Sequence, residues 1–367
     1  MEKVLHILPM NKVSGAEKMA LIMCKNLKDY SPVVVCGGEE LKNVFSNNGI
    51  KSYSLNFSTS KLLSAAKGIK EIVKKEDIKI IHAHDNTASL CGYLAKKIFK
   101  LDAKIISHIH NCYPWLKENG FNKRIDSVIR PKYDYNIACG KTVYDFYKKN
   151  TNYLKEEKSS ILSNAMDIDE ITKRNFNNKD NIKSIYNIPK NKTVFGFIGR
   201  ISEQKGIKPF IIELSKHKNN FSDSIFLLVG SGEQDDEVKS LIKELRMEDM
   251  FILTGHEEDV YKFYPIIDIF FLPSIYEGLP MVILEAMAFK KPIVTMNVGS
   301  ISEVINKETG MLVEVGRYKE FICDLRTLKN NKKLRVKYSN NAFRSVSKNY
   351  NIENYVEEVT KIYNKLA

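Results

Sequence analysis

The chain has 367 residues, 43% of them hydrophobic and 28% charged, and its net charge is +13. At about 100–200 residues per domain this length suggests two domains, and the composition excludes a disordered or collagen-like chain. No run approaches the roughly 20 apolar residues of a transmembrane helix, and the first residues lack the basic region and cleavage site of a signal peptide. We therefore expect a cytoplasmic protein.

The six cysteines and the positive charge constrain the class of protein less sharply. The cysteines form no C-x-x-C pair, which argues against zinc ribbons and redox motifs and fits thiols in a reducing cytosol. A nucleic acid, an anionic membrane or a phosphorylated substrate could each account for the charge. A coding bias toward lysine, asparagine and isoleucine accounts for it equally well, because lysine is spread along the whole chain.

Short β-like runs alternate with helical patterns along the first half of the chain, which is typical of βαβ units in a parallel sheet. Helical patterns cover residues 61–75 and 87–99, among others. The strand-like runs are residues 4–8, 33–36, 52–55, 78–82, 104–108, 135–138 and 159–162.

A turn with a glycine follows the first predicted strand. Ser14 and Gly15 lie between that strand and a helix that begins near residue 16. Turns of this kind present backbone amides to an anion, so Gly15 is a candidate phosphate contact. The pattern is weak by itself, since any turn between a strand and a helix can contain glycine.

Three histidines follow predicted strands of the first half. His84 ends the segment IHAH, and His108 and His110 lie in ISHIHN, at strand carboxyl ends where parallel sheets bind ligands. A buried histidine is more often a core residue, so we favour a functional role for His110 and a core role for His84 and His108. No carboxylate or cysteine spacing accompanies them to indicate a zinc site.

A polar, asparagine-rich segment at about residues 173–192 precedes a second series of strands and is the best candidate for a domain boundary. Doubly wound sheets bind ligands at their strand ends, and two such sheets form a deep cleft. The sequence therefore predicts an α/β protein with two Rossmann-like domains, residues 1–172 and 173–349, that face each other across a cleft. The second series of strand-like runs is residues 194–198, 225–229, 251–254, 269–272, 292–295 and 311–313.

Two helical patterns are amphipathic. Residues 334–366 form one, and we expect its end, residues 350–367, to be a helix that packs back on the first domain. Residues 61–75 form the other, with lysines around an apolar face. This helix either docks on anionic lipid at the inner face of the plasma membrane or, as we favour, covers the sheet.

The strongest signal is the segment SIYEGLPMVILEAMA, in which seven residues separate Glu277 from Glu285. Glu277, Gly278 and Leu279 follow a predicted strand, and Pro280 suits the first position of a helix that contains Glu285. An ionised carboxylate only accepts hydrogen bonds, so each Glu suits a vicinal diol, one on a sugar and one on a ribose. A surface Glu and a helix-end charge are the alternative interpretation.

A second signal, FIGRISEQKG, follows the predicted strand 194–198. Gly199 lets the backbone turn, and Arg200 and Lys205 can converge on a diphosphate, Arg as a fork and Lys as a point charge. Gly206 stands at the entry to a predicted helix, whose amide dipole favours anions. Without the other motifs, two exposed basic residues in a loop would be the default interpretation for a lysine-rich chain.

Together these residues resemble glycosyltransferase family 4, of the GT-B fold, over nearly the whole chain. Arg200 and Lys205 match the family's donor-diphosphate pair. Glu277 and Glu285 match its Glu-x7-Glu motif, whose first Glu is expected on the donor sugar and whose second is expected on the ribose. The segments ISHIHN and ACGKTVYDF resemble a subgroup that builds capsular, exopolysaccharide or O-antigen chains, in which His110 aligns best with the active-site histidine.

Other segments resemble the family with substitutions. Ser14 in SGAE, Ala165 in LSNAMD and Ser300 in NVGSISEVI each replace a glycine of the family pattern. Positions in these segments that keep the family residue include Asn164, Asp167, Gly299 and Glu303.

The resemblance implies a retaining, metal-independent glycosyltransferase without a cofactor. It would move a hexose-type sugar from a nucleotide-diphosphate sugar to a glycan, which we expect to be lipid-linked, in surface polysaccharide synthesis. An anionic membrane surface is a further expected partner, and a nucleic acid is not. The implied catalytic residues are His110, Glu277, Arg200 and Lys205. The implied donor-binding residues are Gly15, Gly199, Arg200, Lys205, Glu277, Gly278, Leu279 and Glu285.

Two alternatives from other classes stay open. One is another enzyme of the same fold, a nucleotide-sugar epimerase or a phosphorylase, which would not couple acceptor glycosylation to release of nucleoside diphosphate. The other is a non-enzymatic nucleic-acid-binding protein, suggested by the charge. Such a protein would bind RNA in a salt-sensitive way that nucleotide sugars do not displace.

Overall fold

The computed structural model describes residues 1–118, 120–173 and 179–367. The chain divides into two compact units: unit 1 consists of Met1–Ala165 and Tyr350–Ala367, and unit 2 consists of Met166–Asn349. The sequence-based division, after residues 172 and 349, differs at the first boundary, because the structural one precedes the asparagine-rich segment.

Within the described residues, unit 1 is built on a parallel sheet of seven strands in the order β3-β2-β1-β4-β5-β6-β7. A sheet wound in both directions from β1 binds ligands at the carboxyl ends of its strands. The strands are β1 (Glu2–Leu8), β2 (Tyr30–Cys36), β3 (Lys51–Ser54), β4 (Ile80–His84), β5 (Lys104–Ile109), β6 (Tyr135–Ala138) and β7 (Ser159–Ile161). The helices are α1 (Gly15–Asn26), α2 (Glu39–Asn47), α3 (Leu62–Glu76), α4 (Asp85–Phe99), α5 (Phe121–Ile129), α6 (Lys141–Asn150) and α15 (Ile352–Leu366).

One face of this sheet packs against α3 and α4. Leu5 and Ile7 of β1 and Ile81 and Ala83 of β4 are fully buried in the resulting cluster. Successive side chains of a strand point to opposite faces of the sheet. The odd-numbered positions of β1 and β4 therefore form this apolar core, and the even-numbered positions face the other side.

Helix α3 covers the sheet rather than presenting an apolar face to lipid. Ala66, Ile69, Ile72 and Val73 are buried in the same cluster, and Leu63 is left 69% exposed. Docking of residues 61–75 on a membrane through this face is therefore wrong, because core packing already occupies it. In the described parts of the chain, no helix is long and apolar enough to cross a membrane.

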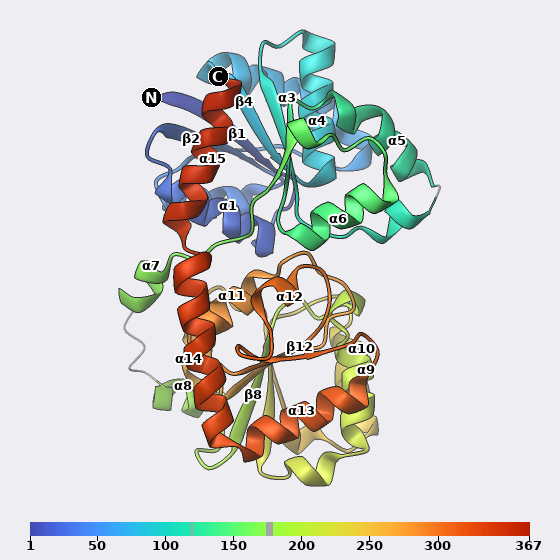
Figure 1. Ribbon diagram of the computed structural model, residues 1–367, viewed down its shortest axis with the longest axis vertical. Coiled ribbons are helices and arrows are strands. Elements are labelled where there is room, and N and C mark those ends of the chain that lie inside the picture. The colour runs from blue at the N-terminus through green and yellow to red at the C-terminus, as the bar shows by residue number, and fades with distance from the viewer. Residues whose placement is uncertain (119, 174–178) are drawn as a thin grey trace. The chain divides into compact units, whose positions relative to one another are not determined.

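The other face of the sheet is covered by α1 and α15, which lie side by side (Figure 1). Tyr363 of α15 is fully buried, and its hydroxyl lies 2.7 Å from Nδ1 of His82. The hydroxyl of Tyr30 donates a hydrogen bond of 2.8 Å to Oδ1 of Asn364. The last helix of the chain is thus part of the interior of unit 1.

The amphipathic pattern of residues 334–366 is two helices, α14 (Lys332–Asn349) in unit 2 and α15 in unit 1. Oδ1 of Asn351 accepts a 3.0 Å hydrogen bond from the amide of Asn354 and so caps the start of α15. The sequence pattern did not reveal this break, because the spacing of apolar residues continues across it and does not depend on the capping residue.

The described residues of unit 2 form a parallel sheet in the order β10-β9-β8-β11-β12-β13. Its core is aromatic: the rings of Phe195 and Phe226 stack at 4.9 Å, and those of Phe210 and Phe271 at 4.7 Å. The strands are β8 (Thr193–Ile198), β9 (Ser224–Val229), β10 (Phe251–Gly255), β11 (Ile269–Leu272), β12 (Ile293–Met296) and β13 (Met311–Val313). Besides α14, the helices are α7 (Ile168–Lys173), α8 (Lys179–Ile185), α9 (Ile207–Ser215), α10 (Asp235–Glu244), α11 (Met281–Ala288), α12 (Ile301–Val304) and α13 (Tyr318–Asn330).

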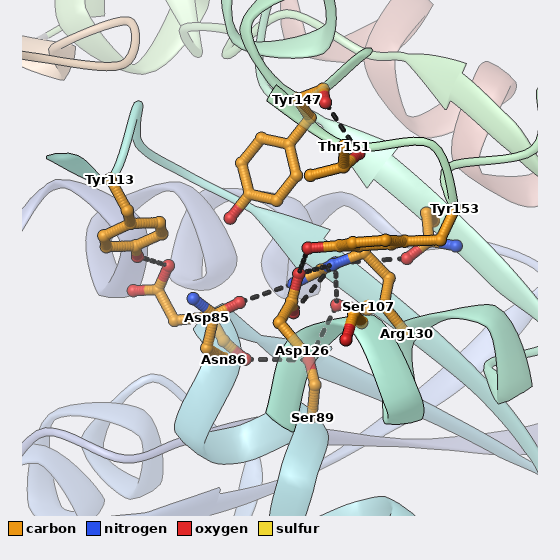
Figure 2. A network of polar contacts seen from close by, with 12 residues as sticks. Asp85, Asn86, Ser89, Ser107, Tyr113, Asp126, Arg130, Tyr147, Thr151 and Tyr153 are labelled. Atoms are coloured by element: carbon orange, nitrogen blue, oxygen red, sulfur yellow. Dashed lines mark hydrogen bonds and ion pairs between the residues drawn. The ribbon is translucent and has the colours of Figure 1, made fainter. Parts of the chain in front are cut away.

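A fully buried arginine joins four elements of unit 1 (Figure 2). Arg130, just after α5, donates through Nε to both carboxylate oxygens of Asp126, at 2.9 and 3.0 Å. Nη1 lies 3.2 Å from the side-chain oxygens of Ser107 in β5 and Asn136 in β6. Nη2 donates to Oδ1 of Asn86 at 2.6 Å. This network fixes the first turn of α4 against β5, next to the strand ends that carry histidines.

We expect Arg130→Ala to destabilise the protein by about 3–5 kcal/mol, because it leaves the buried Asp126 carboxylate without its cation. Urea unfolding of the purified protein measures this change. The control is Arg124→Ala on the exposed side of α5, whose unfolding free energy should change by less than about 0.5 kcal/mol. Equal stability of the two variants would contradict the assignment of Arg130 as a structural anchor.

Candidate functional site

In unit 2, the loop between β11 and α11 holds Glu277 in an ion pair. Oε1 of Glu277 lies 2.5 Å from Nζ of Lys205, and the two side chains are only 7% and 14% exposed. Nε2 of Gln204 donates to the carbonyl of Tyr276 at 2.9 Å. The sequence motifs that contain Lys205 and Glu277 are therefore in direct contact. Pro280 caps α11 instead of occupying its first turn, one position before the expectation.

Two glycines let the backbone close around this pair. Gly206 and Gly299 have φ values of +66° and +55°, a left-handed conformation that other residues rarely adopt. A Cβ on Gly206 would lie 2.2 Å from the carbonyl oxygen of Pro273, and one on Gly299 would lie 2.3 Å from that of Glu277. Leu279 is buried beside them, and the Gly278 carbonyl accepts a 2.7 Å hydrogen bond from Ser300. The loop that contains Glu277 is thus held by close backbone contacts at Gly206 and at Gly299.

Arg200 is more exposed than Lys205 and has a different partner. Its Nε lies 2.9 Å from Oε2 of Glu233, and the two side chains are 64% and 52% exposed. Gly232 packs so closely that a Cβ there would lie 2.2 Å from the carbonyl oxygen of Ile201. Residues 230–233, with the sequence GSGE, therefore shape the turn that follows Gly199, and sequence reasoning missed Glu233 as a partner of Arg200.

Glu285 lies in α11 and is 1% exposed. The hydroxyl of Tyr264 donates a 2.6 Å hydrogen bond to Oε2 of Glu285. Burial, and then the nearby Glu285 carboxylate, raise the pKa of Tyr264 well above its usual value, so the phenol stays protonated and can only donate to the carboxylate. Sequence reasoning missed Tyr264, because nothing local links residues 264 and 285.

In unit 1, the register of three parallel strands gathers five histidines on one face of the sheet. His6 of β1 lies opposite His82 of β4, and His84 lies opposite His108 of β5. Their rings stack, the His108 and His110 centroids being 4.1 Å apart. The structure buries His84 and His108 and leaves His110 half-buried. His6 and His82 were missed, since only the pairing of strands reveals them.

Burial lowers the pKa of every histidine in this layer, to about 3 for His6, so the imidazoles are neutral at neutral pH. Two sets of three have nitrogens within 4.8 Å of one another. The nitrogens hydrogen-bond to one another, however, so an ion would have to displace these contacts. We therefore assign no metal ligand among them.

The surroundings of His110 include a carboxylate. Asp85 follows His84 directly, has a φ of +69°, and its charge partly offsets the effect of burial on the pKa of His110. The Tyr113 ring lies over Asp85, and its hydroxyl donates to Oδ1 (Figure 2). A non-glycine residue in this backbone conformation is uncommon, and such strain often marks functional sites.

Gly15 is the first residue of α1, as the anion-site interpretation requires. The carboxylate of Glu17, however, accepts a 3.1 Å hydrogen bond from the Ser14 amide. Glu17 is buried, which raises its pKa. The Ser14 amide is therefore already bonded within the helix cap and is not offered to a ligand.

Comparisons with known proteins find similarity over both halves of the chain. Residues 178–345 match the family described as Glycosyl transferases group 1, and residues 13–170 match that described as Glycosyltransferase Family 4. An Escherichia coli relative named UDP-Gal:alpha-D-GlcNAc-diphosphoundecaprenol alpha-1,3-galactosyltransferase is 22% identical over 98% of this chain and 96% of its own length. The Staphylococcus aureus capsular polysaccharide biosynthesis glycosyltransferase CapM is 28% identical over 58% of this chain and 57% of its own.

Solved structures show the same fold. The structure of Anabaena Alr3699/HepE in complex with UDP-glucose has a TM-score of 0.88, is 20% identical, and is matched over 100% of both chains. The two parallel α/β units are thus the Rossmann-like domains of a GT-B fold.

Proposed function

Because the chain belongs to glycosyltransferase family 4 and uses a nucleotide sugar as its donor, we propose that it transfers a hexose, with retention of configuration, to a lipid-linked glycan during surface polysaccharide synthesis at the cytoplasmic side of the membrane. The observation that carries this proposal is the largely buried Lys205–Glu277 ion pair at the strand ends of unit 2. It holds a cation for a diphosphate and an acceptor for sugar hydroxyls 2.5 Å apart.

Charge at the leaving diphosphate is the main electrostatic demand of the reaction. Lys205 and Arg200 supply two cations for it, and α9 adds backbone amides at its first turn, just after Gly206. The Arg200–Glu233 pair is exposed, and such pairs contribute about 0–1 kcal/mol, so Arg200 can exchange Glu233 for a phosphate at little cost. Gly199 allows the chain to turn beneath the phosphates.

The carboxylates divide the rest of the donor between them. Glu277 accepts hydrogen bonds from the sugar, and the backbone at Gly278 and Leu279 lies beside it. Glu285 accepts hydrogen bonds from the ribose, with Tyr264 fixing one of its oxygens. We propose His110, in unit 1, as the catalytic histidine, and Gly15 as a backbone contact to the donor.

An acceptor that carries a lipid diphosphate is supported by one relative and one surface. The Escherichia coli relative bears diphosphoundecaprenol in the name of its substrate. In unit 1, a hollow of about 640 Å³ is lined by residues that include Lys123, Arg124 and Lys149. Phe121 and Val128, which are neighbours in the sequence of the lining residues of α5, are 77% and 59% exposed. Cations beside exposed apolar side chains suit a lipid with an anionic headgroup.

If Glu277 and Glu285 have separate roles, replacing each one by glutamine should have a different effect on UDP binding and on turnover. With Glu285→Gln we expect UDP to bind about ten- to a hundredfold more weakly, because a charged hydrogen bond to the ribose is lost. Glu277→Gln should leave UDP binding within about threefold, because the amide oxygen can still accept from Lys205, and it should greatly reduce turnover, because the sugar of the donor loses its charged acceptor. Calorimetry with UDP and an assay of acceptor-dependent UDP release measure both.

The matched control is Glu237→Gln, an exposed carboxylate of α10 paired with Lys208, which should change neither quantity. The opposite result, with UDP binding lost in Glu277→Gln and kept in Glu285→Gln, would refute the division of roles. UDP release that never depends on an acceptor would refute the transferase itself and favour the epimerase or phosphorylase alternative.

We expect full activity in excess EDTA. By sequence, the carboxylates that could hold a divalent cation are the Asp-x-Asp pair Asp167 and Asp169 and the adjacent Asp235 and Asp236. Asp167 accepts a 2.8 Å hydrogen bond from the amide of Glu170, and Asp235 accepts one of 3.0 Å from the amide of Gly232. Asp169 is exposed and pairs with Lys173, so Asp169→Ala should leave the transferase activity unchanged. Loss of turnover in EDTA, restored by Mg²⁺ or Mn²⁺, would overturn the metal-free mechanism.

The acceptor assignment is tested by comparing a diphospholipid-linked glycan with the same glycan free in solution. Joint substitution of Lys123, Arg124 and Lys149 by Ala should raise the KM for the lipid-linked acceptor about tenfold or more, because cation–phosphate contacts are lost. The KM for UDP-sugar should not change. As a control, Lys74→Ala with Lys75→Ala on α3 removes charge elsewhere in unit 1. If the two sets of substitutions raise the KM for the lipid-linked acceptor equally, the hollow beside α5 is not the acceptor site.

A further inference from the structure

Five imidazoles in one layer, four of them buried, raise the question of how their protons are arranged. His110 is connected to two other histidines by a continuous chain of contacts. Its Nε2 lies 3.0 Å from Nδ1 of His84, and Nε2 of His84 lies 3.3 Å from Nδ1 of His6. Both distances suit N–H···N hydrogen bonds. This chain of contacts runs from the half-buried His110, which directly follows β5, through His84 of β4 to the fully buried His6 of β1.

A neutral imidazole has one protonated nitrogen and one bare nitrogen, and a hydrogen bond needs one of each. If His110 carries its proton on Nε2, it donates to Nδ1 of His84. His84 must then carry its own proton on Nε2 and donate to Nδ1 of His6, which is left with a proton on Nε2. If His110 instead carries its proton on Nδ1, the same reasoning places all three protons on Nδ1.

We infer that His84 and His6 are positioning residues for His110: through this chain they fix its ring orientation and force the three histidines into one common tautomer. This role rests on the proposed catalytic part of His110. It explains why a functional histidine is backed by two buried ones rather than by the carboxylate or carbonyl that commonly orients an imidazole. Because the chain uses Nε2 of His110, that nitrogen is held by His84 while the chain is intact.

The groups that titrate around His110 are few. His84 faces it from β4, His108 stacks on it from β5, and Asp85 contributes its charge from the start of α4. Burial keeps the three histidines of the chain neutral, which the tautomer argument requires.

The same layer contains a control. The ring centroid of His82 lies 5.2 Å from that of His6 and 4.6 Å from that of His84, but its hydrogen bonds lead elsewhere, to Nδ1 of His108 at 3.2 Å and to the Tyr363 hydroxyl at 2.7 Å. Replacing His82 therefore also disturbs the packing of the layer, without cutting the chain to His110.

The decisive experiment is nitrogen-15 NMR of the histidine side chains in the intact protein. We expect His6, His84 and His110 all to be neutral and all in one tautomer, either Nε2–H or Nδ1–H. Two different tautomers among the three, or a doubly protonated ring, would overturn the inference. So would stoichiometric metal in the purified protein that chelation removes with a change in these signals. This measurement needs no turnover, so it stands even if the transferase proposal fails.

Turnover gives the functional test. His84→Leu removes the partner of His110 and should lower kcat about tenfold or more, with little change in the KM for donor. In His84→Asn the side-chain amide takes roughly the place of Nδ1 and keeps the contact to His110 but not the contact to His6, so kcat should recover in part, to a value between those of His84→Leu and the native protein. His82→Leu should keep kcat within about threefold at a similar loss of thermal stability. If His84→Asn is as inactive as His84→Leu, or His82→Leu as inactive as either, the positioning role is refuted.

Discussion

The parallel, in-register pairing of strands is the constraint on which the rest of this structure depends. The register pairs Val4 with Ile80 and Ile80 with Lys104, so the even-numbered residues of β1, β4 and β5 share a face. Because these strands run in the same direction, their carboxyl ends also meet at one edge. A histidine at an even position of each strand thus joins a single layer, whereas its odd-numbered neighbours enter an aliphatic core. The chemistry of unit 1 follows from this register, since a shift of one residue would place the imidazoles among leucines and isoleucines.

In unit 2 the parallel arrangement of the strands also brings two loops to one sheet edge. Close backbone contact there holds the two loops together. The loop after β8 and the loop after β11 touch through a hydrogen bond from the amide of Ile275 to the carbonyl of Gln204, 2.7 Å long. Such an approach tolerates no side chain at Gly206 or Gly299. The position of the Lys205–Glu277 pair is therefore set mainly by residues that have no functional group of their own.

These two units explain what could be predicted from the sequence. The strands were found from apolar runs bounded by polar turns, and Lys205, Glu277 and Glu285 were found because each belongs to a local spacing. Helix α3 was recognised as amphipathic, but whether its apolar face meets lipid or protein depends on the sheet beneath it. Tyr264 and Arg130 could not be found, because their partners are brought to them by tertiary packing.

The passage of the chain back into unit 1 at Tyr350 has a consequence for biosynthesis. A ribosome delivers residues in order, at about 5–20 per second, and domains generally fold as they emerge. Here the nascent sheet of unit 1 has no α15 to cover its histidine face until all of unit 2 has been translated. Unit 2, which is continuous in sequence, can fold first and completely. Premature termination before residue 350 would release a protein with an intact unit 2 and a unit 1 whose histidine face lacks the cover that residues 350–367 supply.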